Sequence, residues 1–138
     1  MTNFDTWLYE QLKVPNLEDG KGRMRHSLPQ LPNFQAFLDD LDANGIDTEV
    51  RTLGPWKLTP TQSNFNEDKV NRLIDEKEWD AKPIITSADD YVVDGHHRWL
   101  AAAKLGKDIK SRVIDMKCDD LLVFLKDKPY VEKRTINE

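Results

Sequence analysis

Apolar and polar residues alternate along this chain with two different periods. Apolar residues that recur every three or four positions predict amphipathic helices at residues 3–13, 33–44, 66–78, 99–105 and 118–127. Short apolar runs bounded by turn residues predict strands at residues 84–87, 91–93 and 109–114. Residues 46–58 are ambiguous, because 50–53 and 56–58 have the composition of short strands, and we expect a turn at 59–62. Strands interleaved with helices indicate an α/β or α+β fold.

The junction between the strand at 91–93 and the helix that follows it concentrates the chemistry of the chain. It reads Asp94-Gly95-His96-His97-Arg98, and it holds two of the three histidines. Glycine permits a tight turn, a helix N-terminus suits a phosphate, and the histidines and arginine add hydrogen-bond donors. We expect an anion site here, with Asp94 as an acid/base group at its edge. In the alternative, Asp94 only caps the helix and the turn binds no ligand.

Length and composition set limits on the type of protein. The 138 residues favour one domain with a modest core. A net charge of −5 argues against a protein that is basic as a whole, so any nucleic-acid contact needs a local patch. The single cysteine, Cys118, excludes a disulfide within the chain and fits a reducing compartment. We find no signal-peptide pattern or apolar run of membrane-spanning length, and we expect a cytoplasmic protein with no membrane partner.

Two segments of the chain carry recognisable motifs: Gly95 to Ala101 opens a helix, and residues 58–62 read Leu-Thr-Pro-Thr-Gln. They resemble the Gly-Glu-Arg-Arg-type nucleotide-binding box and the Leu-x-Pro-x-Gln-type segment of the ParB/sulfiredoxin superfamily, and the resemblance covers residues from about 56 to 114. The resemblance implies a small mixed sheet with flanking helices and a nucleotide held by Thr61, Gln62 and the box. It divides the chain into a helical N-terminal extension over 1–50, a ParB/sulfiredoxin-like core over 51–128 and a polar tail over 129–138, within one globular unit.

Two activities known in this superfamily do not fit the sequence. Sulfiredoxins carry a catalytic cysteine at the position of His96, whereas Cys118 lies outside the box. ParB partition proteins carry two arginines where this chain has His97 and Arg98, and they need further DNA-binding and dimerisation domains downstream. We therefore expect neither sulfinic acid reduction nor a partition clamp.

The Asp-Gly-His-His-Arg box is similar to that of free serine kinases in the same superfamily. This similarity implies ATP (or another nucleoside triphosphate or ADP) and Mg²⁺ as cofactors, with Gly95, His96, His97 and Arg98 at the phosphates. Asp94 would orient or deprotonate a hydroxyl or hold the metal, and His96 would assist. Those kinases use a glutamate after the first strand as base. The nearest positions here are Gln62 and Glu67, and Glu67 is either that base or an ordinary first-turn residue.

The phosphoryl acceptor has two candidates. One is a free amino acid such as serine. The other is a hydroxymethylated base in DNA, because Lys21, Arg23 and Arg25 form the densest basic segment and the chain is similar to small phage ParB-like proteins. That segment is otherwise a solvated loop. The leading function is thus an ATP-dependent kinase. Its alternatives are a ParB-like DNA-binding protein or nuclease that acts on backbone phosphates, and a nucleotide-binding regulator without catalysis.

Overall fold

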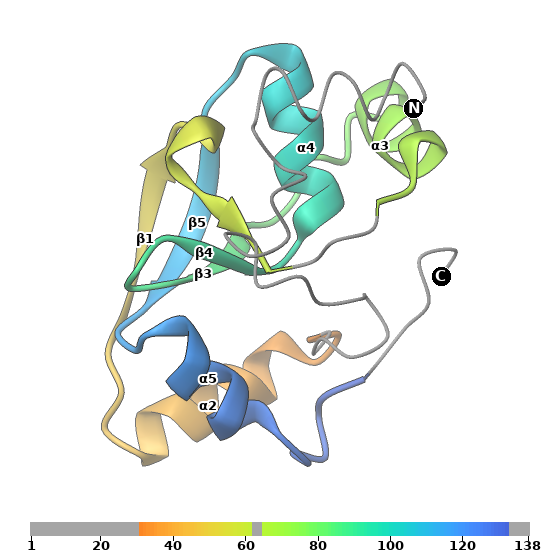
Figure 1. Ribbon diagram of the computed structural model, residues 1–138. Helices are drawn as coiled ribbons and strands as arrows, with labels where there is room; N and C mark the ends of the chain where they lie inside the picture. The colour runs from red at the N-terminus through yellow and green to blue at the C-terminus, as the bar shows by residue number, and fades with distance from the viewer. Residues whose placement is uncertain (1–30, 62–64, 133–138) are drawn as a thin grey trace.

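A mixed sheet lies between two layers of helices in the computed structural model, which describes residues 31–61 and 65–132 (Figure 1). The elements are α2 (Phe34–Ala43), β1 (Thr48–Leu53), η3 (Pro55–Lys57), β2 (Thr59–Pro60), α3 (Glu67–Asp75), β3 (Ile84–Ser87), β4 (Tyr91–Asp94), α4 (His96–Leu105), β5 (Ile109–Ile114) and α5 (Cys118–Leu125). The expected α+β class is confirmed. None of the helices in these ranges is long and apolar enough to cross a membrane.

The sheet has five strands in the order β1-β5-β3-β4-β2. β3 and β4 form an antiparallel hairpin, and β1 is antiparallel to β5 at one edge. The pairs β3–β5 and β2–β4 are parallel. This register places the end of β4 beside the middle of β3, with Asp94 opposite Ile85.

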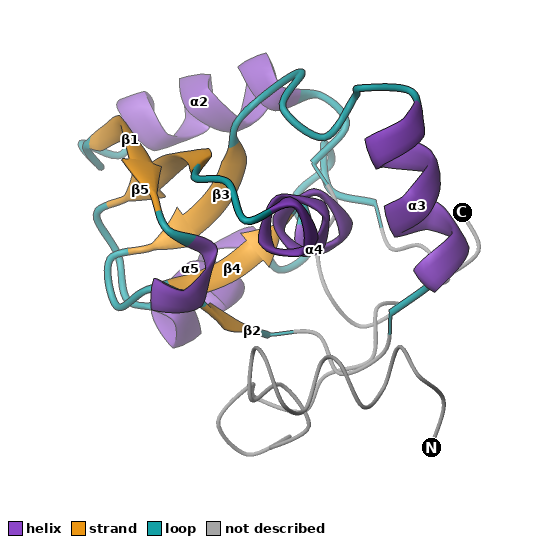
Figure 2. Ribbon diagram, turned by 90° about the horizontal axis from the view of Figure 1, so that it is seen from above, coloured by secondary structure: helices purple, strands orange, loops and turns teal. Residues whose placement is uncertain are grey.

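Alternate side chains of β3 and β4 pack into two separate hydrophobic cores. Successive residues of a strand point to opposite faces of a sheet. Ile84 and Val92 pack with α3 and α4, whereas Ile85 and Val93 pack with α2 and α5. Figure 2 shows α4 over the sheet, with α3 beside it. The strands therefore read as continuous apolar runs because both faces of the sheet are covered.

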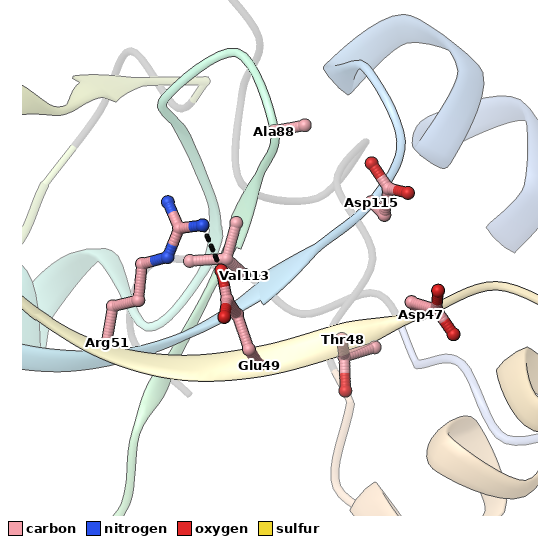
Figure 3. A pocket seen from close by; sticks show the side chains of 7 residues that line it. All are labelled: Asp47, Thr48, Glu49, Arg51, Ala88, Val113 and Asp115. Atoms are coloured by element: carbon pink, nitrogen blue, oxygen red, sulfur yellow. Dashed lines mark ion pairs between the residues drawn. The ribbon is translucent and has the colours of Figure 1, made fainter.

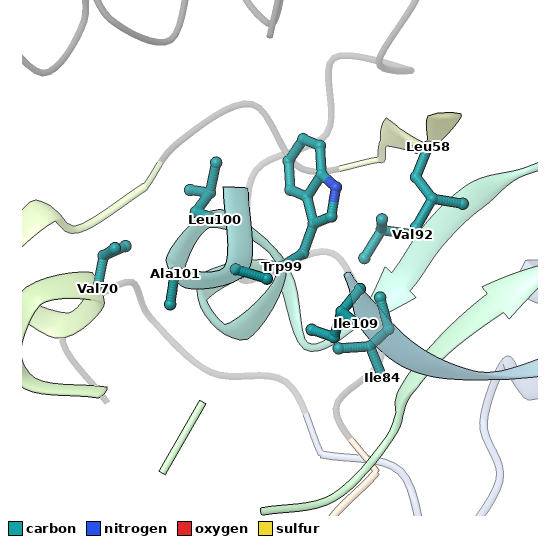
Figure 4. Packing of buried hydrophobic residues seen from close by; sticks show 9 residues of the cluster. Leu58, Val70, Ile84, Val92, Trp99, Leu100, Ala101 and Ile109 are labelled. Carbon is teal, nitrogen blue, oxygen red and sulfur yellow. The ribbon is translucent and has the colours of Figure 1, made fainter. Parts of the chain in front are cut away.

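Trp99 anchors α4 to the segment that precedes β2. Its side chain is fully buried in the α3–α4 core (Figure 4), and its indole Nε1 donates to the carbonyl of Pro55 at 2.7 Å. The strand expected at 56–58 is wrong, because this segment forms the 3₁₀ turn η3 with a proline at its first position. The turn expected at 59–62 begins instead with a short strand, since Thr59 and Pro60 pair with β4.

The helix expected at 33–44 belongs to the main fold. α2 buries Phe37 and Leu41 with Ile85, and the expected boundary between residues 50 and 51 lies inside β1. Tyr130, in the expected polar tail, donates from its hydroxyl to Asp40 Oδ2 at 2.7 Å and so docks the tail on α2. The helix expected at 3–13 lies outside the described residues.

Candidate functional site

Gly95 sets the geometry of the turn between β4 and α4. Its φ of +94° is in the left-handed region, which side chains disfavour. A Cβ atom there would lie 2.7 Å from Ile84 Cγ2 and 2.8 Å from Arg98 Nη2. The first helical hydrogen bond runs from Trp99 N–H to Gly95 O at 2.9 Å. The amides of residues 96–98 thus have no acceptor within the helix, and this is the arrangement that suits an anion.

Asp94 is the last residue of β4 and stands directly before this glycine. Its side chain is half-buried, and Oδ2 accepts a hydrogen bond from Leu31 N–H at 3.3 Å. This is the one hydrogen bond of the Asp94 side chain in the part of the protein that the structure describes. The remaining lone pairs of the carboxylate can accept a proton or contact a cation.

Arg98 binds backbone carbonyls that lie before β3. Its Nη1 donates to Lys82 O at 2.7 Å and to Pro83 O at 3.0 Å, which ties α4 to the start of the hairpin. Burial lowers the pKa of Arg98, and the carboxylate of Asp94 opposes this by favouring the charged form. We expected Arg98 to face a phosphate. Nη1 is bonded to the two carbonyls, so a contact with a phosphate would have to come from the other guanidinium nitrogens.

The two histidines are buried and position backbone. His96 Nε2 accepts from Thr61 N–H at 3.1 Å, and His97 Nε2 accepts from Asn66 N–H at 3.0 Å. A ring nitrogen that accepts carries no proton, so Nε2 of each ring does not donate to a phosphate in this arrangement. We expected both imidazoles to donate toward a phosphate. Their Nε2 atoms accept from the amides of Thr61 and Asn66, and a contact from either ring to a phosphate stays a prediction.

Thr61 and Asn66 each have a further hydrogen bond through their side chains. The Thr61 hydroxyl is buried and donates to Val92 O at 2.8 Å. Asn66 caps α3, since its Oδ1 accepts from Lys69 N–H at 3.1 Å. Glu67 follows Asn66 as the exposed first residue of α3. The bond between Asn66 and His97 therefore brings Glu67 to the same end of the α3–α4 layer as the box.

Sequence reasoning missed two residues of this arrangement. The ring of Phe65 lies 6.2 Å from the centroids of both imidazoles, with an edge-on contact to His97. Asparagine before a helical run is a common N-cap. This signal could have identified Asn66 as the start of α3, but not its hydrogen bond to His97. Gln62, Lys21, Arg23 and Arg25 lie outside the described residues.

Whether the β4–α4 turn can bind a metal depends on the ligands around it. Among residues 31–61 and 65–132, no group of three or more His, Cys, Asp or Glu side chains could hold an ion. Asp94 is a single carboxylate at the site, and Mg²⁺ in nucleotide sites often binds one or two carboxylates together with phosphate oxygens. The described residues of the site therefore fit a metal that arrives with a nucleotide and do not by themselves hold a resident ion.

A pocket of about 290 Å³ lies elsewhere, beside β1 (Figure 3). It is lined by Asp47, Thr48, Glu49, Arg51, Ala88, Val113 and Asp115. The lining has three carboxylates against one arginine and includes no residue of the β4–α4 turn, so it is poorly suited to a nucleotide phosphate.

Comparison with known proteins finds a partial relative. The chain is similar to the uncharacterized protein MJ0188 of Methanocaldococcus jannaschii, with 33% identity over 100 aligned residues. The alignment covers 67% of this chain and 37% of that protein, so the chain spans little more than a third of the relative's length. No family model matches the chain, and no solved structure matches it. The name of this relative assigns it no activity.

Proposed function

We propose that this protein binds a nucleoside triphosphate at the β4–α4 turn and transfers the terminal phosphoryl group to a hydroxyl. The observation that carries the proposal is the position of Asp94. A half-buried carboxylate with a single described hydrogen bond stands directly before a left-handed glycine and the first amides of α4. The resemblance of the box to that of free serine kinases supports the same reaction.

The start of α4 supplies the means to hold phosphate. Amides at a helix N-terminus and the helix dipole favour a negative group. Gly95 has no side chain, so its backbone can be approached closely. The half-buried guanidinium of Arg98 adds positive charge beside the turn. The two histidines contribute by fixing backbone amides around the site.

Asp94 is placed for the proton transfer. In the proposed step it accepts the proton of the acceptor hydroxyl, and the hydroxyl oxygen attacks the terminal phosphorus. The bond from that phosphorus to the bridging oxygen breaks, and the nucleoside diphosphate leaves with the electron pair. Such a reaction depends mainly on positioning and on charge stabilisation. Mg²⁺ bound with the nucleotide would supply part of the positive charge that stabilises the phosphates. If Asp94 holds the metal, Glu67 is the alternative base.

The acceptor we propose is a hydroxymethylated base in DNA, with free serine as the second candidate. The basic segment at Lys21, Arg23 and Arg25 supports the nucleic acid, because such residues contact backbone phosphates. The similarity to free serine kinases supports the amino acid. Both acceptors present a primary hydroxyl, so the chemistry at Asp94 is the same.

The test is label transfer from γ-labelled ATP in the presence of Mg²⁺. Acceptors are hydroxymethylated DNA, unmodified DNA of the same sequence, and serine. Wild type should label one hydroxyl-bearing acceptor and leave unmodified DNA unlabelled. Asp94→Asn keeps an acceptor for Leu31 N–H but removes the base, so we expect a loss of about a hundredfold or more in turnover.

Two variants serve as controls. Asp90→Asn makes the same chemical change in the exposed β3–β4 turn and should leave turnover unchanged. Glu67→Gln tests the rival base, and a loss confined to this variant would assign the proton transfer to Glu67. Strand scission without label transfer would identify a nuclease, and the absence of label on every acceptor would refute phosphoryl transfer.

A further inference from the structure

β1 is an edge strand with an exposed outer side. β5 pairs with one side of β1, and within the described residues no strand pairs with the other (Figure 1). The four central residues of β1 are exposed, and Val50 keeps 45% of its surface accessible. An edge of this kind presents unpaired backbone groups that can pair with another chain.

The charges on β1 are arranged symmetrically about Val50. Glu49 and Arg51 flank it, point to the same face of the sheet and form an ion pair with each other (Figure 3). A strand with opposite charges at equal distances on either side of one residue is complementary to itself when it is reversed. This feature lies outside the β4–α4 turn and is independent of the proposed function.

We propose that a second copy of this chain pairs with β1, antiparallel, about a two-fold axis at Val50. In this register Val50 faces Val50 of the second copy. Glu49 of each copy faces Arg51 of the other, and Thr48 faces Thr52. Cross-strand pairs of opposite charge stabilise an antiparallel ladder. The axis is perpendicular to the sheet, so the helix layers of both copies stay on matching sides.

Charge also selects this register over its neighbours. A shift of two residues places Glu49 opposite Glu49 of the second copy, or Arg51 opposite Arg51, and like charges directly opposite destabilise a pair. A shift of one residue pairs side chains that belong to opposite faces. Charges on an edge strand can also serve only to discourage pairing, but that role needs no symmetric arrangement. A protein that stays monomeric in the test below would support that role.

The first test is charge reversal, read by sedimentation velocity over a range of protein concentrations. Glu49→Arg and Arg51→Glu each set like charges opposite one another in both pairs, so each should raise the dimer dissociation constant by roughly tenfold or more. An equimolar mixture of the two variants restores both pairs and should dimerise again, as should the double variant E49R/R51E. Unchanged unfolding temperatures show that each variant is folded.

A cross-link tests the register directly. Across the two-fold axis, Val50→Cys places two thiols on residues whose Cα atoms are about 4.5–5.5 Å apart, within disulfide reach. The matched control is Thr52→Cys on the same exposed strand, where the two residues are separated by roughly 13 Å. The native Cys118 is buried. We expect rapid oxidation to a disulfide dimer with V50C only. A wild type that stays monomeric at every concentration, or equal cross-linking of the two variants, would overturn the proposal.

Discussion

At the β4–α4 turn, the sequence predicts the roles of some residues and not of others. The glycine turn and the helix start followed from Asp94-Gly95 and the helical run after them. The positions of the histidine rings did not, because their partners Thr61 and Asn66 lie 35 and 31 positions earlier in the chain. Adjacent histidines resemble a ligand-binding pair in the sequence, but here burial and backbone amides determine their hydrogen bonds. Local patterns predict a turn well and long-range hydrogen bonds poorly.

Gly95→Ala should destabilise the protein more than an equivalent change elsewhere. The alanine would need a φ near +94° and would bring its Cβ against Ile84 and Arg98. Strain of this kind costs about 1–3 kcal/mol. Thermal unfolding of Gly106→Ala is the matched control, because Gly106 also has a positive φ but an added Cβ would meet no atom within 4 Å. Equal losses of stability in the two variants would show that the close approach at Gly95 has no energetic weight.

Among the elements, long periodic segments were the best predicted. The helix expected at 33–44 and the strands expected at 84–87 and 109–114 are confirmed, because each has a strong apolar pattern. The strand expected at 56–58 was wrong, and η3 in its place has a contact that no local pattern reveals, because the Pro55 carbonyl accepts from Trp99 44 positions along the chain. Pairing of β2 with β4 is also a tertiary effect that no local pattern reveals.

The basic segment allows a prediction about the acceptor. If DNA is the acceptor, neutralising Lys21, Arg23 and Arg25 together should raise the apparent KM for DNA. It should also flatten the salt dependence, because each lost phosphate contact removes about 0.9 from the log–log slope on duplex DNA. ATP hydrolysis without acceptor is the internal control and should not change. An unchanged salt slope would exclude this segment as the DNA contact and would favour free serine.

At the scale of the whole molecule, two cores and the C-terminal segment hold the layers together. Tyr130 lies 6.1 Å from the Phe37 ring and donates to Asp40, which also pairs with Lys128 at 3.0 Å. A mixed sheet with flanking helices was expected from the resemblance of the chain. The docking of Tyr130 was not, because a polar tail gives no periodic signal.

Acidification should weaken this C-terminal contact. The Tyr130 hydroxyl, and then the Lys128 ammonium, hold the pKa of Asp40 below its ordinary value of 3.8. A carboxylate with a lowered folded-state pKa stabilises the fold above its unfolded value, and that stabilisation is lost as the pH falls through the folded value. Asp40→Asn should therefore reduce the loss of stability below about pH 4, as measured by urea unfolding at several pH values. Asp39→Asn, on the same helix, is the control. An acid slope equal to that of wild type in D40N would contradict the role of this contact.

The start of α4 is the proposed phosphate site, and a nucleotide titration followed by amide NMR tests this proposal most directly. With ¹⁵N-labelled protein, the account predicts that ATP and Mg²⁺ shift the backbone signals of Gly95, His96, His97 and Arg98 most strongly, with one shared dissociation constant. Gly95→Ala should weaken that binding. The absence of shifts at saturating ATP, or the largest shifts at the acidic pocket beside β1, would contradict the assignment.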